Sequence, residues 1–177
     1  MSTDPVTIVP SDPAWTEKFE RGAAILRAAL GDLVLGVEHI GSTSVPGLAA
    51  KPVVDMLVGL ASMKEVLAAR PILEALGWEF PDSINAQLTD RRFGKLAPGG
   101  ERTHHVHVVV FEGDEWERLV AFRNALRASL DLARRYEELK RDLAAKYADQ
   151  REKYTGAKTD FVDDVLRSVG APTVRRQ

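Results

Sequence analysis

The stretch that decides the fold is EHIGSTSVPGLAAKPVVDML, residues 38–57. A strand-like segment, 33–40, leads into a loop of Gly, Ser, Thr and Pro residues, 41–47, and then into an apolar segment, 53–60. The last segment is apolar on both faces, which is typical of a strand covered on two sides. Asp55 lies inside it, and an unpaired ionised carboxylate is costly to bury there. The sequence therefore predicts a partner that compensates this charge.

Two kinds of partner would stabilise Asp55. A Gly-Ser turn that leaves a strand lets the backbone approach a ligand, and a carboxylate on the next strand can hold a divalent cation that bridges to nucleotide phosphates. The turn residues that would face the phosphate oxygens are Gly41, Ser42, Thr43 and Ser44. Alternatively, these residues form an ordinary turn, and Asp55 pairs with backbone amides or with a cation such as Lys51.

A second strand is predicted at HHVHVVVF, residues 104–111, which alternates and is β-branched. Period-two alternation places His105 and His107 on one face, about 7 Å apart at their Cα atoms, and His104 on the other. If this strand neighbours the strand of Asp55, the three side chains are suited to one metal ion or to a proton relay. The alternative is that one histidine is a satisfied core residue and the other a surface residue.

Basic residues at apolar positions indicate an anion in the interior. Arg123 falls inside the apolar arc of one predicted helix, and Lys158 falls within the stripe of another. Arg91 and Arg92 add a basic pair in a segment without a clear pattern, where such pairs are more often simply solvated. These cations would neutralise a phosphate or an acidic acceptor, although snorkelling, or salt bridges with Glu38 or Asp55, would explain them equally well.

Helical periodicity accounts for most of the remaining chain. The predicted helices run from Asp12-Pro13 to Gly31, from a Ser62–Glu65 capping box through a kink at Pro71 to Gly77, and from Asp114 almost to the end with breaks near Leu130 and Gly156. Residues 78–103 are less regular, with one short strand near 92–96. We expect one domain over residues 1–170 and a loose tail over 171–177.

Composition narrows the class of protein. The 177 residues are 45% apolar and 28% charged, which suits one compact domain. The formal charge of −2 makes nucleic acid or an acidic membrane an unfavoured partner, and the lack of cysteine excludes disulfides, thiolate metal sites and a thiol nucleophile. No run reaches the roughly 20 apolar residues of a membrane span, and no targeting signal precedes the first helix. We expect a soluble, cytoplasmic protein.

Several segments together resemble the signature of the GrpB family. They are EHIGSTSVPGLAAKPVVDMLVG, DRRF, HHVHV, WERLVAFRNALR, YEELKRDLAAKY and YTGAKTDFV. The family is similar to the nucleotidyltransferase superfamily, which implies an α+β fold with a nucleotidyltransferase-like mixed β-sheet flanked by helices and a helical C-terminal part. It also implies that the Gly-Ser turn contacts nucleotide phosphates and that strand carboxylates hold magnesium.

The resemblance is incomplete in two places. Asn124 and Ala125 stand where many family members look like Asp-Tyr, and the superfamily pattern is broken at one further position. Asp55 matches the first carboxylate of the usual Asp-x-Asp/Glu pair, but Leu57 stands at the second and cannot bind a cation. We therefore carry two hypotheses. In the first, the protein binds a nucleoside triphosphate with Mg²⁺, Mn²⁺ or Zn²⁺ and transfers a nucleotidyl group to an unidentified acceptor. In the second, it is a ligand-binding or accessory module such as those fused to dephospho-CoA kinase.

The candidate site follows from the first hypothesis. Three residues would carry catalysis or the cation, as ligands or as a general base: Asp55, His105 and His107. The residues that would contact the nucleotide or another phosphorylated ligand are Gly41, Ser42, Thr43, Ser44, Lys51, Arg92, Arg123 and Lys158.

Overall fold

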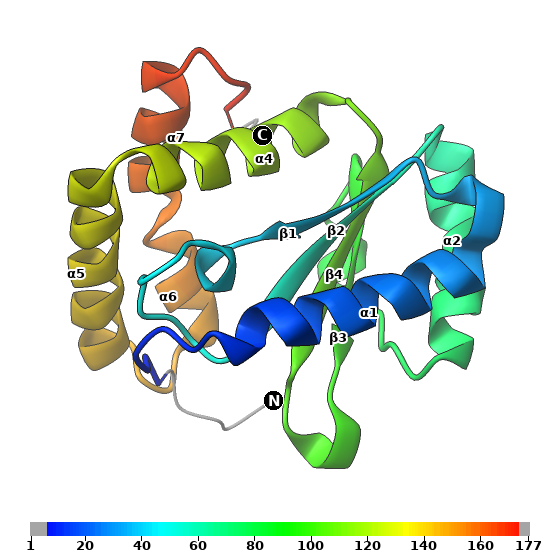
Figure 1. The fold of residues 1–177 in the computed structure, drawn as a ribbon, viewed down its shortest axis with the longest axis horizontal. Helices are drawn as coiled ribbons and strands as arrows, with labels where there is room; N and C mark the ends of the chain where they lie inside the picture. Colours follow the sequence, from blue (N-terminus) through cyan, green and yellow to red (C-terminus); the bar gives the residue numbers. More distant parts are fainter. Residues whose placement is uncertain (1–6, 174–177) are drawn as a thin grey trace.

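A four-stranded mixed sheet forms the centre of the computed structural model, which describes residues 7–173 (Figure 1). Its strands are β1 (Gly36–Ile40), β2 (Val54–Leu60), β3 (Arg91–Leu96) and β4 (His104–Val110). They lie in the order β1-β2-β4-β3, with β2 and β4 parallel and the two outer pairs antiparallel. The prediction of an α+β protein with a mixed β-sheet flanked by helices is confirmed.

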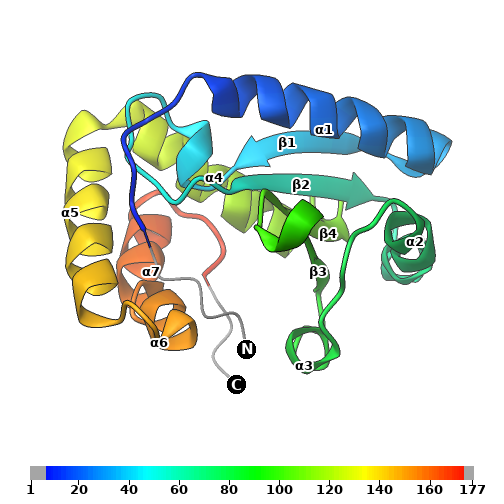
Figure 2. The same ribbon diagram turned by 90° about the horizontal axis from the view of Figure 1, so that it is seen from below.

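One face of the sheet is covered by α1 (Ala14–Leu30) and α2 (Met63–Ala75). α1 lies along β1 and β2 on this face (Figure 2). The stripe predicted for α1 is its buried face and packs with Met56 and Val106 in one apolar core. Removing this stripe from water is a main source of stability for the helix. Its members are Trp15, Phe19, Ala23, Leu26 and Leu30.

The opposite face is covered in part by the C-terminal helices (Figure 2). These are α4 (Asp114–Ala128), α5 (Leu130–Lys146), α6 (Arg151–Gly156) and α7 (Thr159–Ser168). Trp116 and Leu119 of α4 pack against Leu57 and Val109 of the sheet. Polar side chains of β2 and β4 lie on the same face, beyond this apolar cluster. The helical C-terminal part is as predicted.

Two boundaries in the first half of the chain differ from the prediction. β1 begins at Gly36, because residues 31–33 form a turn of 3-10 helix instead of the start of a strand. The irregular segment contains a short helix that the pattern did not indicate, α3 (Asp82–Asn85), and β3 begins one residue earlier than expected, at Arg91. A four-residue helix is too short to show a period, so its sequence resembles a turn.

The start of α2 confirms the predicted cap with one shift. Ser62 Oγ accepts a hydrogen bond from the Glu65 N–H at 3.3 Å, while the Glu65 carboxylate accepts from the Ala61 N–H at 2.8 Å. A capping box in the strict sense would return to the N–H of Ser62 itself. Pro71 lies inside α2, which continues to Ala75.

The C-terminal helical run has one more break than predicted. Ser129 separates α4 from α5, and its hydroxyl accepts the Leu132 N–H at 3.2 Å, which caps α5. Gly156 ends α6 as expected, but residues 147–150 also leave the helix. Nothing in that segment is a strong helix breaker. Of the predicted tail, residues 171–173 have no regular structure, and 174–177 lie outside the described residues.

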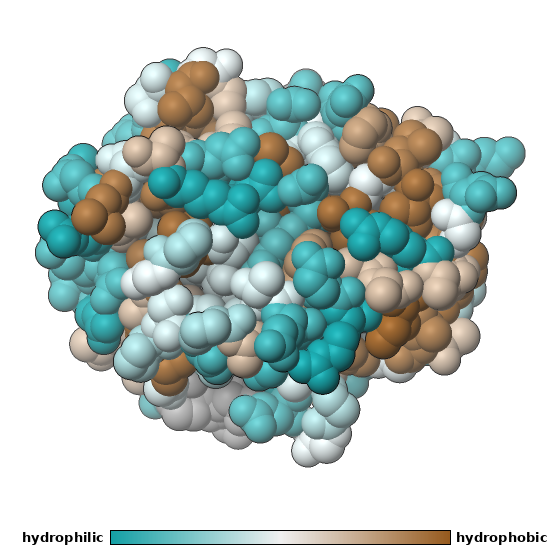
Figure 3. Space-filling view, in the orientation of Figure 1, coloured by the Kyte–Doolittle hydropathy of each residue, from teal (hydrophilic) through white to brown (hydrophobic). Residues whose placement is uncertain are grey.

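The surface in the view of Figure 3 is hydrophilic over much of α1 and α4, with hydrophobic residues gathered at the end of the molecule near α2. Over residues 7–173, no helix is both long and apolar enough to cross a membrane.

Candidate functional site

A cleft of about 1910 Å³ opens on the partly covered face of the sheet. Its volume exceeds that of an ordinary small-molecule pocket. It is lined by strand residues, by the turn that follows β1 and by residues of the C-terminal helices. The structure thus brings together most of the residues that the sequence predicted: Gly41, Ser42, Thr43, Lys51, Asp55, His105, His107 and Lys158.

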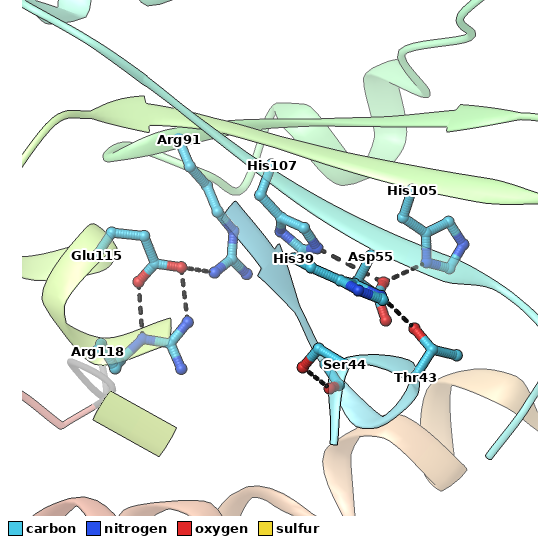
Figure 4. A network of polar contacts seen from close by, with 10 residues as sticks. His39, Thr43, Ser44, Asp55, Arg91, His105, His107, Glu115 and Arg118 are labelled. Carbon is cyan, nitrogen blue, oxygen red and sulfur yellow. Dashed lines mark hydrogen bonds and ion pairs between the residues drawn. The ribbon is translucent and has the colours of Figure 1, made fainter. Parts of the chain in front are cut away.

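Asp55 is the acidic centre of the cleft (Figure 4). The parallel pairing of β2 and β4 sets Asp55 opposite His105, and the two side chains share one face of the sheet. Asp55 Oδ1 lies 2.9 Å from His105 Nδ1 and 3.9 Å from His107 Nε2. The predicted neighbourhood of the acid and the paired imidazoles is therefore confirmed as geometry.

The electrostatics of the trio favour the ionised form of the acid. Burial alone would raise the pKa of the Asp55 carboxyl, but interactions with His105 and His107 outweigh it and hold that pKa well below its usual range. Burial lowers the pKa of His107, although Asp55 offsets part of this effect. His105 Nε2 and His107 Nδ1 are buried without a hydrogen-bond partner among the described residues. Both rings lie against Phe93, with centroids 5.0 and 5.4 Å away.

Gly41 lets the backbone pass directly beside the acid. Its φ is 69°, and a Cβ at this position would lie 2.3 Å from Asp55 Oδ2. The Ser44 hydroxyl donates to the Gly41 carbonyl at 2.6 Å, and Thr43 Oγ1 lies 3.0 Å from His39 Nε2. Ser42 lies beside Tyr136 in the cleft, whereas Ser44 is not among the cleft-lining residues. Ser42 thus presents its hydroxyl to the cleft, where it interacts with Tyr136.

The predicted cations divide into two groups. Lys158 lines the cleft, with its Nζ 4.4 Å from the centre of the Tyr154 ring. Burial lowers the pKa of Lys158 to about 8, against an opposing effect of Asp55. Lys51 also lines the cleft.

Arg92 and Arg123 lie elsewhere. Arg92 alternates to the other face of β3 and donates to the Leu88 carbonyl at 2.8 Å. Arg123 Nη1 donates to Glu38 Oε2 at 2.5 Å and to the His39 carbonyl at 2.9 Å. The structural salt bridge with Glu38, one of the two explanations left open by the sequence, is thus present, and neither arginine is among the cleft-lining residues.

Lys140 is a functional candidate that the sequence analysis missed. It is 2% exposed, donates to the Ala49 carbonyl at 2.5 Å, and lies with its Nζ 5.0 Å from the centre of the Tyr136 ring. Burial lowers its pKa to about 7. The helical spacing could have identified it as an inward-facing lysine. Lys140 follows Tyr136 by four residues and precedes Leu143 by three, so it lies on the buried stripe of α5.

The cleft also contains an arginine-rich cluster of Arg91, Glu115 and Arg118 that the sequence analysis did not include in the candidate site (Figure 4). Arg91 precedes the predicted Arg92 by one residue. Because side chains alternate along a strand, this shift places its guanidinium on the cleft side of the sheet.

The side chains around Asp55 carry the types of atom that bind a cation, but they are not positioned around one. One carboxylate oxygen and two imidazole nitrogens are ligands that Zn²⁺ or Mn²⁺ accept, while Mg²⁺ prefers oxygen. The side chain at the second carboxylate position, Leu57, is fully buried in the apolar cluster under α4. Within residues 7–173, no three His, Asp or Glu side chains are arranged to hold an ion. A cation here would require the His105 to Asp55 hydrogen bond to open.

Fold and site together define an α+β protein with an acid–histidine centre in a cleft whose other wall carries lysines. The chain belongs to the GrpB family: residues 5–168 match the model of that family, described as GrpB protein. A UPF0157 protein of Pseudomonas aeruginosa is 39% identical over 171 residues, 96% of this chain and 70% of that protein. The crystal structure of GrpB from Enterococcus faecalis has 38% sequence identity and a TM-score of 0.82, over 92% of this chain and 96% of that one.

Two further matches are more distant. A dephospho-CoA kinase of Mycolicibacterium paratuberculosis is 26% identical over 187 residues, 92% of this chain and 46% of that protein. The Cid1 poly(U) polymerase has 18% identity and a TM-score of 0.46, over 76% of this chain and 45% of that one. Because likeness at this level does not define an activity, the chemistry of this chain has to be argued from its own residues.

Proposed function

We propose that the cleft binds a nucleoside triphosphate, or a related phosphorylated ligand, and that the protein transfers a nucleotidyl group from it to an acceptor. The observation that carries the proposal is the pairing of one ionised carboxylate, Asp55, with the buried Lys140 and the partly buried Lys158 in a single cleft. A polyphosphate is the ligand whose charge suits such lysines, while the acid is suited to a bridging cation.

The lysines support this ligand class because nearby carboxylates offset only part of the effect of burial on each amine. Among the described residues, neither Lys140 nor Lys158 has a carboxylate within ion-pair distance, and each lies instead over a tyrosine ring. Burial lowers the pKa of both amines, so an anion that entered the cleft would favour their charged forms. Ser42 adds a hydroxyl on the same side of the acid.

A divalent cation, Mg²⁺, Mn²⁺ or Zn²⁺, is part of the proposal. Asp55, His105 and His107 are the residues that would hold it, and its chemistry would be to neutralise charge on the transferring phosphate. Without the cation, Asp55 and His105 still form an acid–histidine pair that can orient an imidazole toward a proton.

The test is ligand-dependent melting in the presence of ATP and each cation. At a hundredfold excess of ligand over Kd, the wild-type protein should gain roughly 5–10 °C in Tm. Asp55→Asn and Lys158→Gln should lose most of this shift, while Asp82→Asn, an exposed carboxylate outside the cleft, should keep it. The apo Tm of every variant must be measured too, because removing a buried charge alone can change stability. A full shift in Asp55→Asn would contradict the assignment of the acid.

Leu57 favours a second candidate function, ligand binding without transfer. Because Leu57 replaces the second carboxylate and is part of the apolar core, the chain could have kept ligand binding and lost transfer, as an accessory module would. The likeness to part of a dephospho-CoA kinase supports this alternative. Release of pyrophosphate from ATP, measured against a panel of small acceptors, separates the two, since an accessory module would bind ATP without turnover.

A further inference from the structure

The cluster of Arg91, Glu115 and Arg118 lines the same cleft as Asp55 but has no role in the function proposed above. Glu115 is the shared centre: Arg118 donates to both of its oxygens, at 2.7 and 2.6 Å, and Arg91 donates to Oε1. The exposed fractions of the side chains are 24% for Arg91, 8% for Glu115 and 12% for Arg118. Two guanidinium groups thus share one carboxylate in a largely dry part of the cleft.

The two guanidinium groups have more N–H donors than Glu115 can accept. Each guanidinium carries five N–H donors, and Glu115 accepts from only three nitrogen atoms of the two groups. Arg91 Nε is buried without a partner among the described residues. Burial lowers the pKa of Arg118, and Asp90 and Asp163 offset part of this effect. Because a guanidinium stays protonated in proteins, both cations are maintained. A bidentate oxyanion, a carboxylate or a phosphate, is what such a fork recognises.

The position of the cluster separates it from Asp55. Arg91 pairs with Val109 in the sheet, whereas Asp55 pairs with His105. Arg91 is therefore displaced from Asp55 by four residues along the strand direction and by two strands across the sheet. This displacement places their Cα atoms roughly 16 Å apart. The charge of Arg91 is felt by His107, so the cluster borders the acid–histidine centre. Figure 4 shows the cluster beside His107 and away from the turn at Ser44.

We propose that Arg91 and Arg118, held by Glu115, form a second anion site that binds the carboxylate or phosphate of an acidic co-substrate. The first anion, the nucleotide, occupies the end with Ser42, Lys140 and Lys158. The co-substrate is therefore an acidic small molecule. This assignment rests on the proposed function for the identity of the first ligand, but binding at the second site can be measured without it.

The experiment is a titration with inorganic phosphate and, separately, with glutarate, followed by the NMR signals of the arginine Nε groups. In the wild type and in Lys158→Gln, the Nε signals of Arg91 and Arg118 should shift as the anion binds. Arg118→Gln should raise the Kd for this event at least tenfold, and Arg21→Gln, an exposed arginine of α1 outside the cleft, should leave it unchanged. Arg118→Lys, which keeps the charge but not the fork, should give an intermediate Kd and serves if the glutamine variant does not fold.

The controls decide between this site and two other outcomes. If the Nε signals stay in place up to tens of millimolar anion, the second site does not exist. If Arg118→Gln weakens ATP as much as it weakens phosphate, the arginines belong to the nucleotide site and the proposal is wrong. If ATP does not bind the wild type at all while the Nε signals still respond to both anions, the nucleotide proposal fails and the second site stands. A glutarate response without a phosphate response would assign the site to carboxylates.

Discussion

Gly41 is held in a conformation that glycine adopts most readily, with the acid of the site directly against it. Its φ and ψ are 69° and −174°, and an added Cβ would meet Asp55 Oδ2 at 2.3 Å. Gly41→Ala should therefore lower the free energy of unfolding by more than about 2 kcal/mol, from backbone strain plus the collision. Urea denaturation measures this.

Gly47 is the matched control for that substitution. Its φ is also positive, 77°, but a Cβ there would have no neighbour within 4 Å. Gly47→Ala should carry the backbone cost alone, about 1 kcal/mol. Equal losses in the two variants would show that contact with the acid does not matter.

Lys140 makes stability depend on pH. Its pKa is lowered from 10.5 to about 7 by burial, so between these values the unfolded chain binds a proton that the folded chain does not. Stability due to this lysine should thus rise with pH across that window. The unfolding free energy of the wild type minus that of Lys140→Met should increase by on the order of 2–4 kcal/mol from pH 7 to 9.5. Lys146→Met, at an exposed lysine of α5, is the control, and a flat difference would contradict the argument.

At the scale of elements, α4 fixes the end of β1 and the turn that follows it. Arg123 donates to the His39 carbonyl and pairs with Glu38, and Arg127 donates twice to the Ser44 carbonyl, at 3.0 and 2.7 Å. These bonds hold the turn beside Asp55 from the helix side. The inward cation that the sequence detected at position 123 is accordingly a structural one.

This role predicts a loss of stability when Arg123 is replaced. Arg123→Leu leaves the buried His39 carbonyl without its donor and should lower the free energy of unfolding by about 1–3 kcal/mol. Glu38→Gln, which removes only a partly exposed partner, should cost less than about 1 kcal/mol. Chemical denaturation of both variants tests this; a stable Arg123→Leu protein with lost ATP binding would instead return Arg123 to the ligand site.

The whole molecule is a sheet with one face sealed by α1 and α2 and the other shared between α4 and the cleft. Ligand contacts are proposed on the turn after β1 and, far from it in sequence, on α5 and near α6. ATP should therefore slow amide hydrogen exchange in these three segments together and leave α1 and α2 unchanged. Exchange measured by mass spectrometry with and without ATP tests this, and protection confined to one segment would mean that the ligand does not bridge the cleft.

The sequence by itself determined what depends on short-range periodicity. The alternation of β4 placed His105 and His107 on one face, and the stripe of α1 defined its buried side. The Gly-Ser turn and the acid within an apolar run were visible because both break a local pattern.

Only the tertiary structure decided which side chains lie opposite one another. Arg123 meets Glu38 across 85 positions and Lys140 meets Ala49 across 91, so no local pattern contains either contact. The cleft-facing arginine is Arg91 instead of Arg92, because the register of β3 on β4 fixes which residue turns inward. Side-chain direction along an element follows from a fixed repeat, whereas the partner of each side chain depends on strand order and helix packing.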